Sequence, residues 1–259
     1  MYILKKIITK FLNFYGLTII RSKNFNKILS NLKSHKILSL LKECDQDNIT
    51  KIIKYLDFSK SELGQDIFVL NELNFKKNGF FIEFGAADGL EMSNSYLLEN
   101  NFGWNGILAE PSRSKHKALK ENRKSNIETK CVWTKSDVTL TFNEVSLSEF
   151  STIDSYSNND EHLQKRKNGI KYEVKTISLN DLLNKYNAPY FIDYLSIDTE
   201  GSEFEILSSL NFEKYKIKII TCEHNNTNIK DKVFNLLKKN GYNRKFSHLS
   251  EYDDWYVLN

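Results

Sequence analysis

The feature that most constrains the fold is a regular alternation, from residue 79 onward, of short apolar runs with segments of helical pattern. The apolar runs predict strands, and the segments between them predict helices. Repeated βα units of this kind build a mostly parallel sheet with helices on both faces. Strands are predicted at residues 80–84, 106–110, 127–133, 137–142, 190–197, 217–222, 242–247 and 254–258. Helices are predicted at residues 93–100, 112–123, 178–186, 202–210 and 228–239.

Two parts of the chain depart from this alternation. Helical patterns without strands cover residues 26–42, 48–57 and 62–75. Residues 143–170 are polar and irregular, and a loop of that length in a compact domain is often functional, so this segment is a candidate lid. It contains Asp160, His162 and Arg166, which either reach an acceptor or form a solvated charged surface, and we favour the second interpretation.

The charge of the chain is divided unevenly. Residues 1–42 carry nine Lys or Arg and no acidic residue, whereas residues 43–259 carry 28 basic and 33 acidic residues. The body is therefore mildly acidic, which weighs against nucleic-acid binding, because tracking phosphates needs a basic face on the fold itself. No apolar run approaches the roughly 20 residues of a membrane-spanning helix. Three widely spaced cysteines indicate a reducing, cytoplasmic location.

The first residues form a basic amphipathic pattern, with apolar side chains at helical spacing and lysines between them. Such a helix either contacts a membrane surface or a partner protein through residues 2–15, or packs on the body or on a second copy in a homo-oligomer. We favour packing, and keep a peripheral position at the inner face of the membrane as the alternative. We predict a helical extension over residues 1–60 and a catalytic domain over residues 61–259.

A glycine turn follows the first predicted strand, in the run Glu83-Phe84-Gly85-Ala86-Ala87-Asp88-Gly89. Small residues at a strand-to-helix turn let the backbone approach a ligand closely. The spacing is GxxxG, not the GxGxxG of a dinucleotide site, and its carboxylates would repel a pyrophosphate. They suit a ligand with an ammonium group and no phosphates, such as S-adenosylmethionine. Glu110 ends the second strand, where a carboxylate binds both ribose hydroxyls.

Five segments carry a family resemblance: NGFFIEFGAADGLEMSNSYLLE, GWNGILAEPS, DYLSIDTEGSEFEIL, IITCEHNNT and YDDWYV. They resemble the FkbM-type methyltransferase family, whose members use S-adenosylmethionine to methylate hydroxyl groups, often on sugars. The resemblance covers about residues 61–258 and implies a Rossmann-like methyltransferase fold with a mostly parallel seven-stranded sheet. It implies a cofactor site formed by Glu83, Gly85, Ala86, Asp88, Gly89, Ser93, Asn94, Glu110 and Pro111. Gln65 and Asp66 either close over this cofactor or cap a helix.

The acceptor side is predicted at the ends of two later strands, at Asp198-Thr199-Glu200-Gly201 and at Glu223-His224. These strands are neighbours in methyltransferases of this class, so their polar side chains should converge. His224 or Asp198 could act as the general base that takes the proton of an attacking hydroxyl, with Glu200 beside them. Alternatively, Asp198, Glu223 and His224 hold Mg²⁺ or Mn²⁺. The structural alternative is that the acids cap helices and that His224 bonds a backbone carbonyl.

The function predicted from these features is O-methylation of a sugar or glycan-precursor hydroxyl. An NAD-dependent sugar oxidoreductase is one alternative, but neither Tyr186 nor Tyr190 has the lysine four residues later that this chemistry uses. A cofactor-binding scaffold without catalysis is the other. Near the end of the chain, Asp253, Asp254 and Trp255 either bind a pyranose or form a core tryptophan with exposed acids.

Overall fold

The computed structural model of the chain describes residues 36–259, and the basic helix predicted within residues 2–15 lies outside them. The chain divides into two compact units, Met1–Lys42 and Glu43–Asn259. The second unit contains both sheets and the helices that cover them. The domain boundary predicted after residue 60 stays a prediction.

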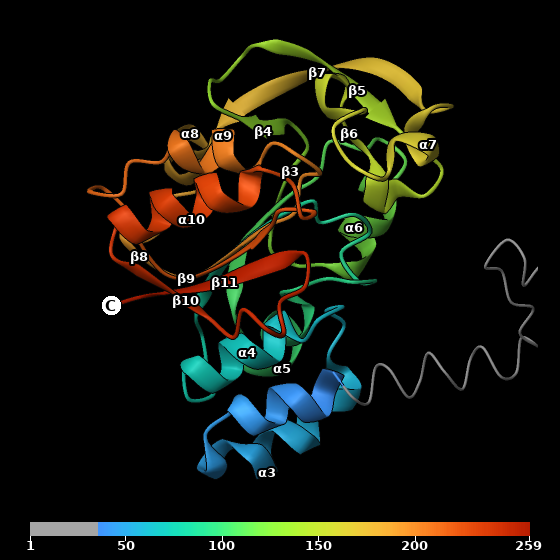
Figure 1. Ribbon diagram of the computed structural model, residues 1–259. Helices are drawn as coiled ribbons and strands as arrows, with labels where there is room; N and C mark the ends of the chain where they lie inside the picture. The colour runs from blue at the N-terminus through green and yellow to red at the C-terminus, as the bar shows by residue number, and fades with distance from the viewer. Residues whose placement is uncertain (1–35) are drawn as a thin grey trace, which may run out of the picture. The chain divides into compact units, whose positions relative to one another are not determined.

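A seven-stranded sheet forms the centre of the second unit, in the order β10-β11-β9-β8-β1-β2-β3 (Figure 1). Its strands are β1 (Phe80–Phe84), β2 (Asn105–Ala109), β3 (Asn126–Glu128), β8 (Phe191–Ile197), β9 (Lys216–Glu223), β10 (Tyr242–Lys245) and β11 (Asp253–Leu258). The neighbours from β9 through β3 pair in parallel. β11 runs antiparallel to both β9 and β10, so the sheet is mostly but not purely parallel.

Helices cover both faces of this sheet, with α8, α9 and α10 on one side and α4 and α5 on the other (Figure 1). Their bounds are α3 (Gln46–Tyr55), η1 (Leu56–Phe58), α4 (Gln65–Glu72), α5 (Tyr96–Phe102), α6 (His116–Asn122), α8 (Leu179–Lys185), α9 (Glu203–Ser208) and α10 (Ile229–Lys239). Ser178 caps α8 as predicted, since its Oγ accepts a hydrogen bond from the Asp181 backbone N–H at 3.1 Å. Ile82 and Phe84 of β1 pack in the core with α8–α10, because alternate residues of a strand face opposite sides.

A second sheet, of four strands in the order β4-β7-β5-β6, was only partly predicted. It contains β4 (Cys131–Trp133), β5 (Thr139–Glu144), β6 (Thr152–Ile153) and β7 (Ile170–Ser178), with η2 (Ser148–Phe150), η3 (Asp154–Tyr156) and α7 (Leu163–Arg166) between them. The single strand predicted at residues 127–133 is therefore two strands, β3 and β4, in different sheets. We call residues 131–178 the cap. The predicted lid segment, residues 143–170, belongs to it and contains short helices and a strand.

The C-terminal tryptophan belongs to the core. Trp255 is fully buried, and its ring stacks on Phe68 of α4 with centroids 4.8 Å apart. Asp253 and Asp254 are also buried, so the prediction of exposed acids beside this indole is wrong. A fully buried indole cannot stack on a sugar, which excludes the pyranose site at Trp255.

Candidate active site

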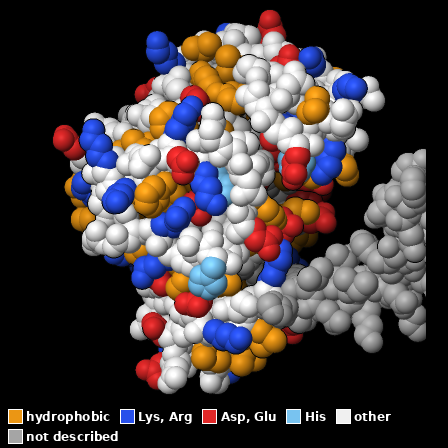
Figure 2. Space-filling model, in the orientation of Figure 1, with side chains coloured by type: hydrophobic (Ala, Val, Ile, Leu, Met, Phe, Trp, Pro, Cys, Tyr) orange, Lys and Arg blue, Asp and Glu red, His pale blue; other side chains and the backbone are white. Residues whose placement is uncertain are grey.

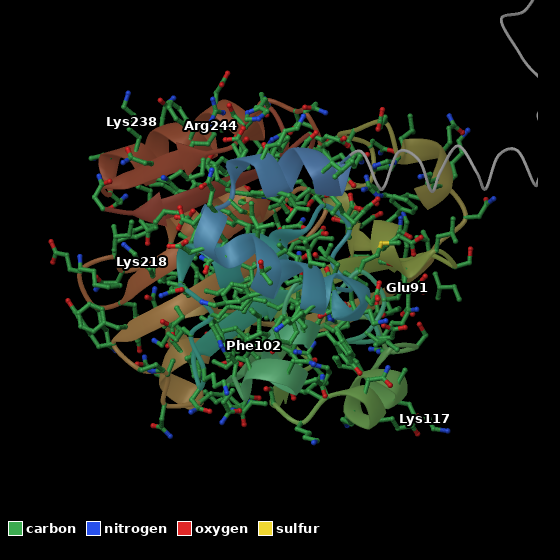
Figure 3. The ribbon with its side chains drawn as sticks, turned by 90° about the horizontal axis from the view of Figure 1, so that it is seen from below. Glu91, Phe102, Lys117, Lys218, Lys238 and Arg244 are labelled. Atoms are coloured by element: carbon green, nitrogen blue, oxygen red, sulfur yellow. The ribbon has the colours of Figure 1, made fainter. Side chains whose placement is uncertain are left out.

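A cavity of about 360 Å³ opens at the carboxyl ends of β1, β2 and β8, between the main sheet and the cap. In Figure 2, acidic side chains gather around a hollow below the cap. Glu91, one of the lining residues, lies on the side of the molecule that carries the cap, away from Lys218 on β9 (Figure 3). Of the predicted cofactor residues, the cavity is lined by Glu83, Gly85, Ala86, Asp88, Ser93, Asn94, Glu110 and Pro111.

The glycine turn brings the ends of β1 and β8 into contact. Gly85 has φ +73°, and a Cβ atom built on it would lie 1.8 Å from the backbone oxygen of Asp198. Its N–H donates to the carbonyl of Ala109 at the end of β2, at 3.1 Å. Ala87 also adopts a positive φ, +46°. Only glycine fits at residue 85, because the neighbouring strand leaves no room for a side chain.

Glu110 connects the turn after β1 with the loop after β2. One carboxylate oxygen accepts from the Ala87 N–H and the other from the Ser112 N–H, both at 2.7 Å. Burial raises the pKa of this carboxyl, and the two backbone donors oppose that rise. The Ser112 side chain adds a third hydrogen bond, and a carboxylate can accept about four. The carboxylate is thus held rigidly at the cavity wall with acceptor capacity to spare.

Glu83 is occupied by internal partners. Its carboxylate accepts hydrogen bonds from the Ser93 hydroxyl at 3.0 Å, from the Asn94 N–H at 2.7 Å, and from the Ser95 hydroxyl. The fully buried guanidinium of Arg123 lies 3.6 Å away and balances this charge. Sequence analysis did not identify Arg123, whose partners are far away along the chain. Glu83 therefore shapes the loop of residues 93–95, which in turn lines the cavity.

Two further turn residues line the cavity in different ways. Asp88 uses one carboxylate oxygen to accept from the Leu90 and Glu91 N–H groups, both at 2.9 Å, and so fixes the turn. Asn94 donates to the Ser196 hydroxyl at 2.9 Å. Within residues 36–259, no donor lies within hydrogen-bond distance of the buried Asn94 Oδ1. A buried acceptor of this kind at a cavity wall is suited to a donor on a ligand.

Three predicted cofactor residues do not line the cavity. Gly89 approaches the side chain of Arg123, where an added Cβ would lie 2.5 Å from Cγ. Gln65 donates to the Asp253 carboxylate at 2.9 Å. Asp66 accepts from the hydroxyls of Ser59 and Ser61, at 2.7 and 2.6 Å. Asp66 thus ties the segment before α4, and the N-cap residue of that helix is Gly64, so neither Gln65 nor Asp66 takes the capping position.

Three carboxyl groups converge on the acceptor side. Oxygen atoms of Asp198, Glu200 and Glu223 all lie within 4.8 Å of one another, because β8 and β9 are neighbours as predicted. Asp198 and Glu223 share a hydrogen bond. Burial and the neighbouring acids raise the pKa of Asp198 to about 7 and that of Glu200 to about 9. Asp198 and Glu200 line the cavity, which brings this group to the cofactor turn.

His224 does not join these carboxyls. Its Nδ1 accepts from the Asn226 N–H at 3.1 Å, and its Nε2 lies 3.7 Å from the Asp254 carboxylate. Consecutive residues at a strand end point to opposite sides, so Glu223 and His224 cannot both face Asp198. The predicted convergence of Asp198 and Glu223 is confirmed. The third group close to them is Glu200, and not His224.

The prediction that Arg166 lies on a solvated charged surface is wrong. This side chain is 1% exposed, not solvated. Its guanidinium donates to both Asp160 oxygens at 2.8 Å and to the Glu200 carboxylate at 2.6 Å. The buried guanidinium therefore joins the cap to the acceptor side of the cavity.

A family model described as the methyltransferase FkbM domain matches residues 83–244. The solved structure of precorrin-6y C5,15-methyltransferase from Geobacter metallireducens is 10% identical, with a TM-score of 0.41 over 74% of this chain and 85% of that one. A putative RNA methyltransferase from Pyrococcus horikoshii is also 10% identical, with a TM-score of 0.37 over 75% and 81%. No curated protein matches the sequence significantly. Within residues 36–259, every helix is too short or too polar to cross a bilayer.

Proposed function

The chain belongs to the FkbM methyltransferase domain family, and from this we propose that it transfers a methyl group from S-adenosylmethionine to a hydroxyl of a sugar or glycan precursor. The observation that carries the proposal is a single cavity lined both by the glycine turn with Glu110 and by Asp198. One end of that cavity suits the cofactor, and the other suits an acceptor that must lose a proton.

The residues of the cofactor end fit S-adenosylmethionine. The remaining acceptor capacity of Glu110 suits a ribose hydroxyl, and the unpartnered Asn94 Oδ1 suits an ammonium donor. Gly85 lets the backbone approach the amino-acid part of the ligand. When bound, S-adenosylmethionine supplies a methyl group that is activated by its sulfonium. This chain's residues hold the ligand, and the carboxylates of Asp88 and Glu110 at the cavity wall disfavour a diphosphate.

Asp198 is the general base of this proposal. An alcohol is a weak nucleophile at neutral pH, and its proton must leave as the oxygen attacks. Asp198 lines the cavity beside the cofactor turn, and its pKa of about 7 is suited to taking a proton near neutral pH. The protonated Glu223 carboxyl donates a hydrogen bond to Asp198, which stabilises the Asp198 carboxylate that accepts the hydroxyl proton. His224 is not a candidate base, because its ring faces Asp254.

Two measurements test the proposal against its alternatives. Isothermal titration with S-adenosylhomocysteine and with NADH separates a methyltransferase from an oxidoreductase, and we expect only S-adenosylhomocysteine to bind. Transfer of a labelled methyl group to a panel of free, nucleotide-linked and polymeric sugars then separates an enzyme from a scaffold. NADH binding would overturn the assignment. Binding of S-adenosylhomocysteine without transfer to any sugar would favour the scaffold or another acceptor class.

Replacing Glu110 with glutamine should weaken S-adenosylhomocysteine binding by about 10- to 100-fold, the value of a hydrogen bond to a charged group. Glutamine keeps the size of the side chain, but it replaces one carboxylate oxygen with an N–H₂ group. That group cannot accept the hydrogen bond from the Ala87 or Ser112 N–H that the oxygen accepted. Titration calorimetry measures the change in Kd. Glu91→Gln, at an exposed position on the same cavity, is the matched control and should leave the Kd unchanged. Equal affinities for the two variants would contradict the ribose-binding role of Glu110.

A divalent metal ion is the second candidate on the acceptor side. The cluster of three carboxyls favours it, because Mg²⁺ and Mn²⁺ prefer oxygen ligands. Two observations weigh against it: His224 lies elsewhere, and the Arg166 guanidinium already pairs with Glu200 at 2.6 Å. We therefore expect full methyl transfer in excess chelator. Activity that disappears with chelator and returns with Mg²⁺ or Mn²⁺ would replace the general-base mechanism with a metal-assisted one.

A further inference from the structure

The cap supplies a large part of the cavity wall. Residues Ser146, Leu147, Ser148, Glu149, Ser151 and Ile153 of the cap all line the cavity. The β-strands of the main sheet supply the opposite wall, including Asp198 and Glu200 at the end of β8. The geometry of the site therefore depends on what fixes residues 146–153 relative to the loop after β8.

Arg166 makes that connection from inside the cap. Its Nε donates to the carbonyl of Phe150 at 2.8 Å, and its Nη1 donates to both oxygens of Asp160 at 2.8 Å. Its Nη2 donates to the Glu200 carboxylate at 2.6 Å. The planar guanidinium can bind these three groups together because its donors are fixed in one fork. One side chain thus joins the cavity-lining segment of the cap to the acceptor side of the site.

Glu200 is held by the cap at its backbone as well. It adopts φ +59°, a strained conformation for a non-glycine residue, so surrounding contacts must maintain it. The Thr152 hydroxyl donates to the Glu200 carbonyl at 2.8 Å. The Asn225 side chain donates to the same carboxylate oxygen as Arg166, at 3.0 Å. Glu200 therefore points towards Asp198 because cap and loop residues hold it there.

We propose that Arg166 is a positioning residue for methyl transfer, which fixes the Glu200 carboxylate beside Asp198 and holds residues 146–153 of the cap over the cavity. This inference rests on the proposed function for its kinetic consequences. Without the guanidinium, the oxygens of Glu200 and Asp160 would lose hydrogen-bond donors inside the protein, which is unfavourable. The cap segment would also lose the hydrogen bond that its Phe150 carbonyl accepts from Arg166.

Arg166→Lys is the principal test, because lysine keeps the charge but cannot reach three acceptors at once. We expect kcat to fall about 10- to 100-fold, since small misplacements of catalytic groups have effects of that size. The Kd of S-adenosylhomocysteine should stay unchanged, because Arg166 does not line the cofactor end of the cavity. Lys167→Met, at the exposed neighbouring position, is the control and should change neither quantity. An unchanged kcat in folded Arg166→Lys would overturn the proposal.

A double-mutant cycle with Glu200→Gln separates positioning from a general loss of stability. If Arg166 acts through Glu200, the effect of Arg166→Lys on kcat should largely disappear in the Glu200→Gln background. Fully additive effects would contradict the proposal. Asn225→Ala, which removes only the weaker donor to Glu200, should lower kcat less than Arg166→Lys does. This milder variant keeps the test available if the lysine variant does not fold.

Hydrogen exchange tests the cap independently of any activity. We expect the backbone amides of residues 146–153 to exchange at least about 10-fold faster in Arg166→Lys than in the wild type, since local opening needs less free energy there. Unchanged exchange would overturn the role of Arg166 in holding the cap. If the wild type binds S-adenosylhomocysteine but methylates no hydroxyl, the proposed function fails. The exchange experiment then still decides the role of Arg166.

Discussion

Asp198→Asn should lower kcat for methyl transfer by about 10²- to 10⁴-fold, the usual contribution of a general base. Asparagine keeps the size of the side chain and can still hydrogen-bond to Glu223, so the structure of the loop should persist. What is lost is the carboxylate that accepts the hydroxyl proton. Single-turnover methyl transfer, started with the cofactor bound, measures this step apart from binding. We expect the Kd of S-adenosylhomocysteine to stay close to that of the wild type.

The pH dependence gives this prediction a second, independent readout. Asp198 has a pKa raised to about 7, and it acts as a base only after it has lost its proton. The rate of the wild type should therefore rise as the pH increases through about 7, and this rise should disappear in Asp198→Asn. Glu149→Gln, at an exposed carboxylate on the same cavity, should keep the wild-type profile. A similar rise in Asp198→Asn would assign the titration, and the base, to another group.

The raised pKa values also affect stability, with a sign opposite to that of an ordinary ion-paired carboxylate. Asp198 and Glu200 bind protons more tightly in the folded protein than in the unfolded chain. Their contribution to stability is complete below their unfolded pKa values of about 4. It is lost as the pH rises through about 7 and then about 9. Keeping acids close together at the ends of β8 and β9 therefore destabilises the folded protein at the pH where we propose that Asp198 acts as a base.

The main sheet and the glycine turn beside the cavity could be predicted because their signals are local. An apolar run such as residues 80–84 predicts a buried strand, and the glycine turn directly follows it. Glu110 was found by the rule that ligands bind beyond the carboxyl ends of parallel strands. The convergence of Asp198 and Glu223 followed in the same way from the adjacency of their two strands.

The rest of the site depends on contacts that no local pattern encodes. Arg166 bonds Glu200, a residue 34 positions away, and a run of polar residues around it resembles a solvated loop. Arg123 is likewise 40 residues from Glu83. The sequence pattern of the helix predicted at residues 112–123 does not show that this arginine is buried. The misassigned His224 shows a different limit. The position of a strand end was correct, but the direction of each side chain there alternates, and only Glu223 points to the site.

Gly85→Ala should destabilise the folded protein by about 2–6 kcal/mol, the sum of backbone strain and overpacking. At φ +73°, any side chain adopts an unfavourable backbone conformation. In addition, the new Cβ would lie 1.8 Å from the Asp198 carbonyl oxygen, which belongs to a neighbouring strand end and cannot rotate away. The end of β8 would have to move, and Asp198 with it. Denaturant unfolding measures the change in the free energy of unfolding.

Gly241→Ala is the control that isolates the contact between the two strand ends. Gly241 also has a positive φ, +88°. A Cβ atom added there would lie 3.6 Å from its nearest neighbour, Cδ1 of Leu258, which is an ordinary van der Waals contact. Its alanine variant should therefore lose only the backbone term, about 1–2 kcal/mol. The difference between the two variants measures how closely the cofactor turn approaches Asp198. Equal losses of unfolding free energy in the two variants would mean that the turn has room for a side chain. The close contact between Gly85 and Asp198 would then be wrong.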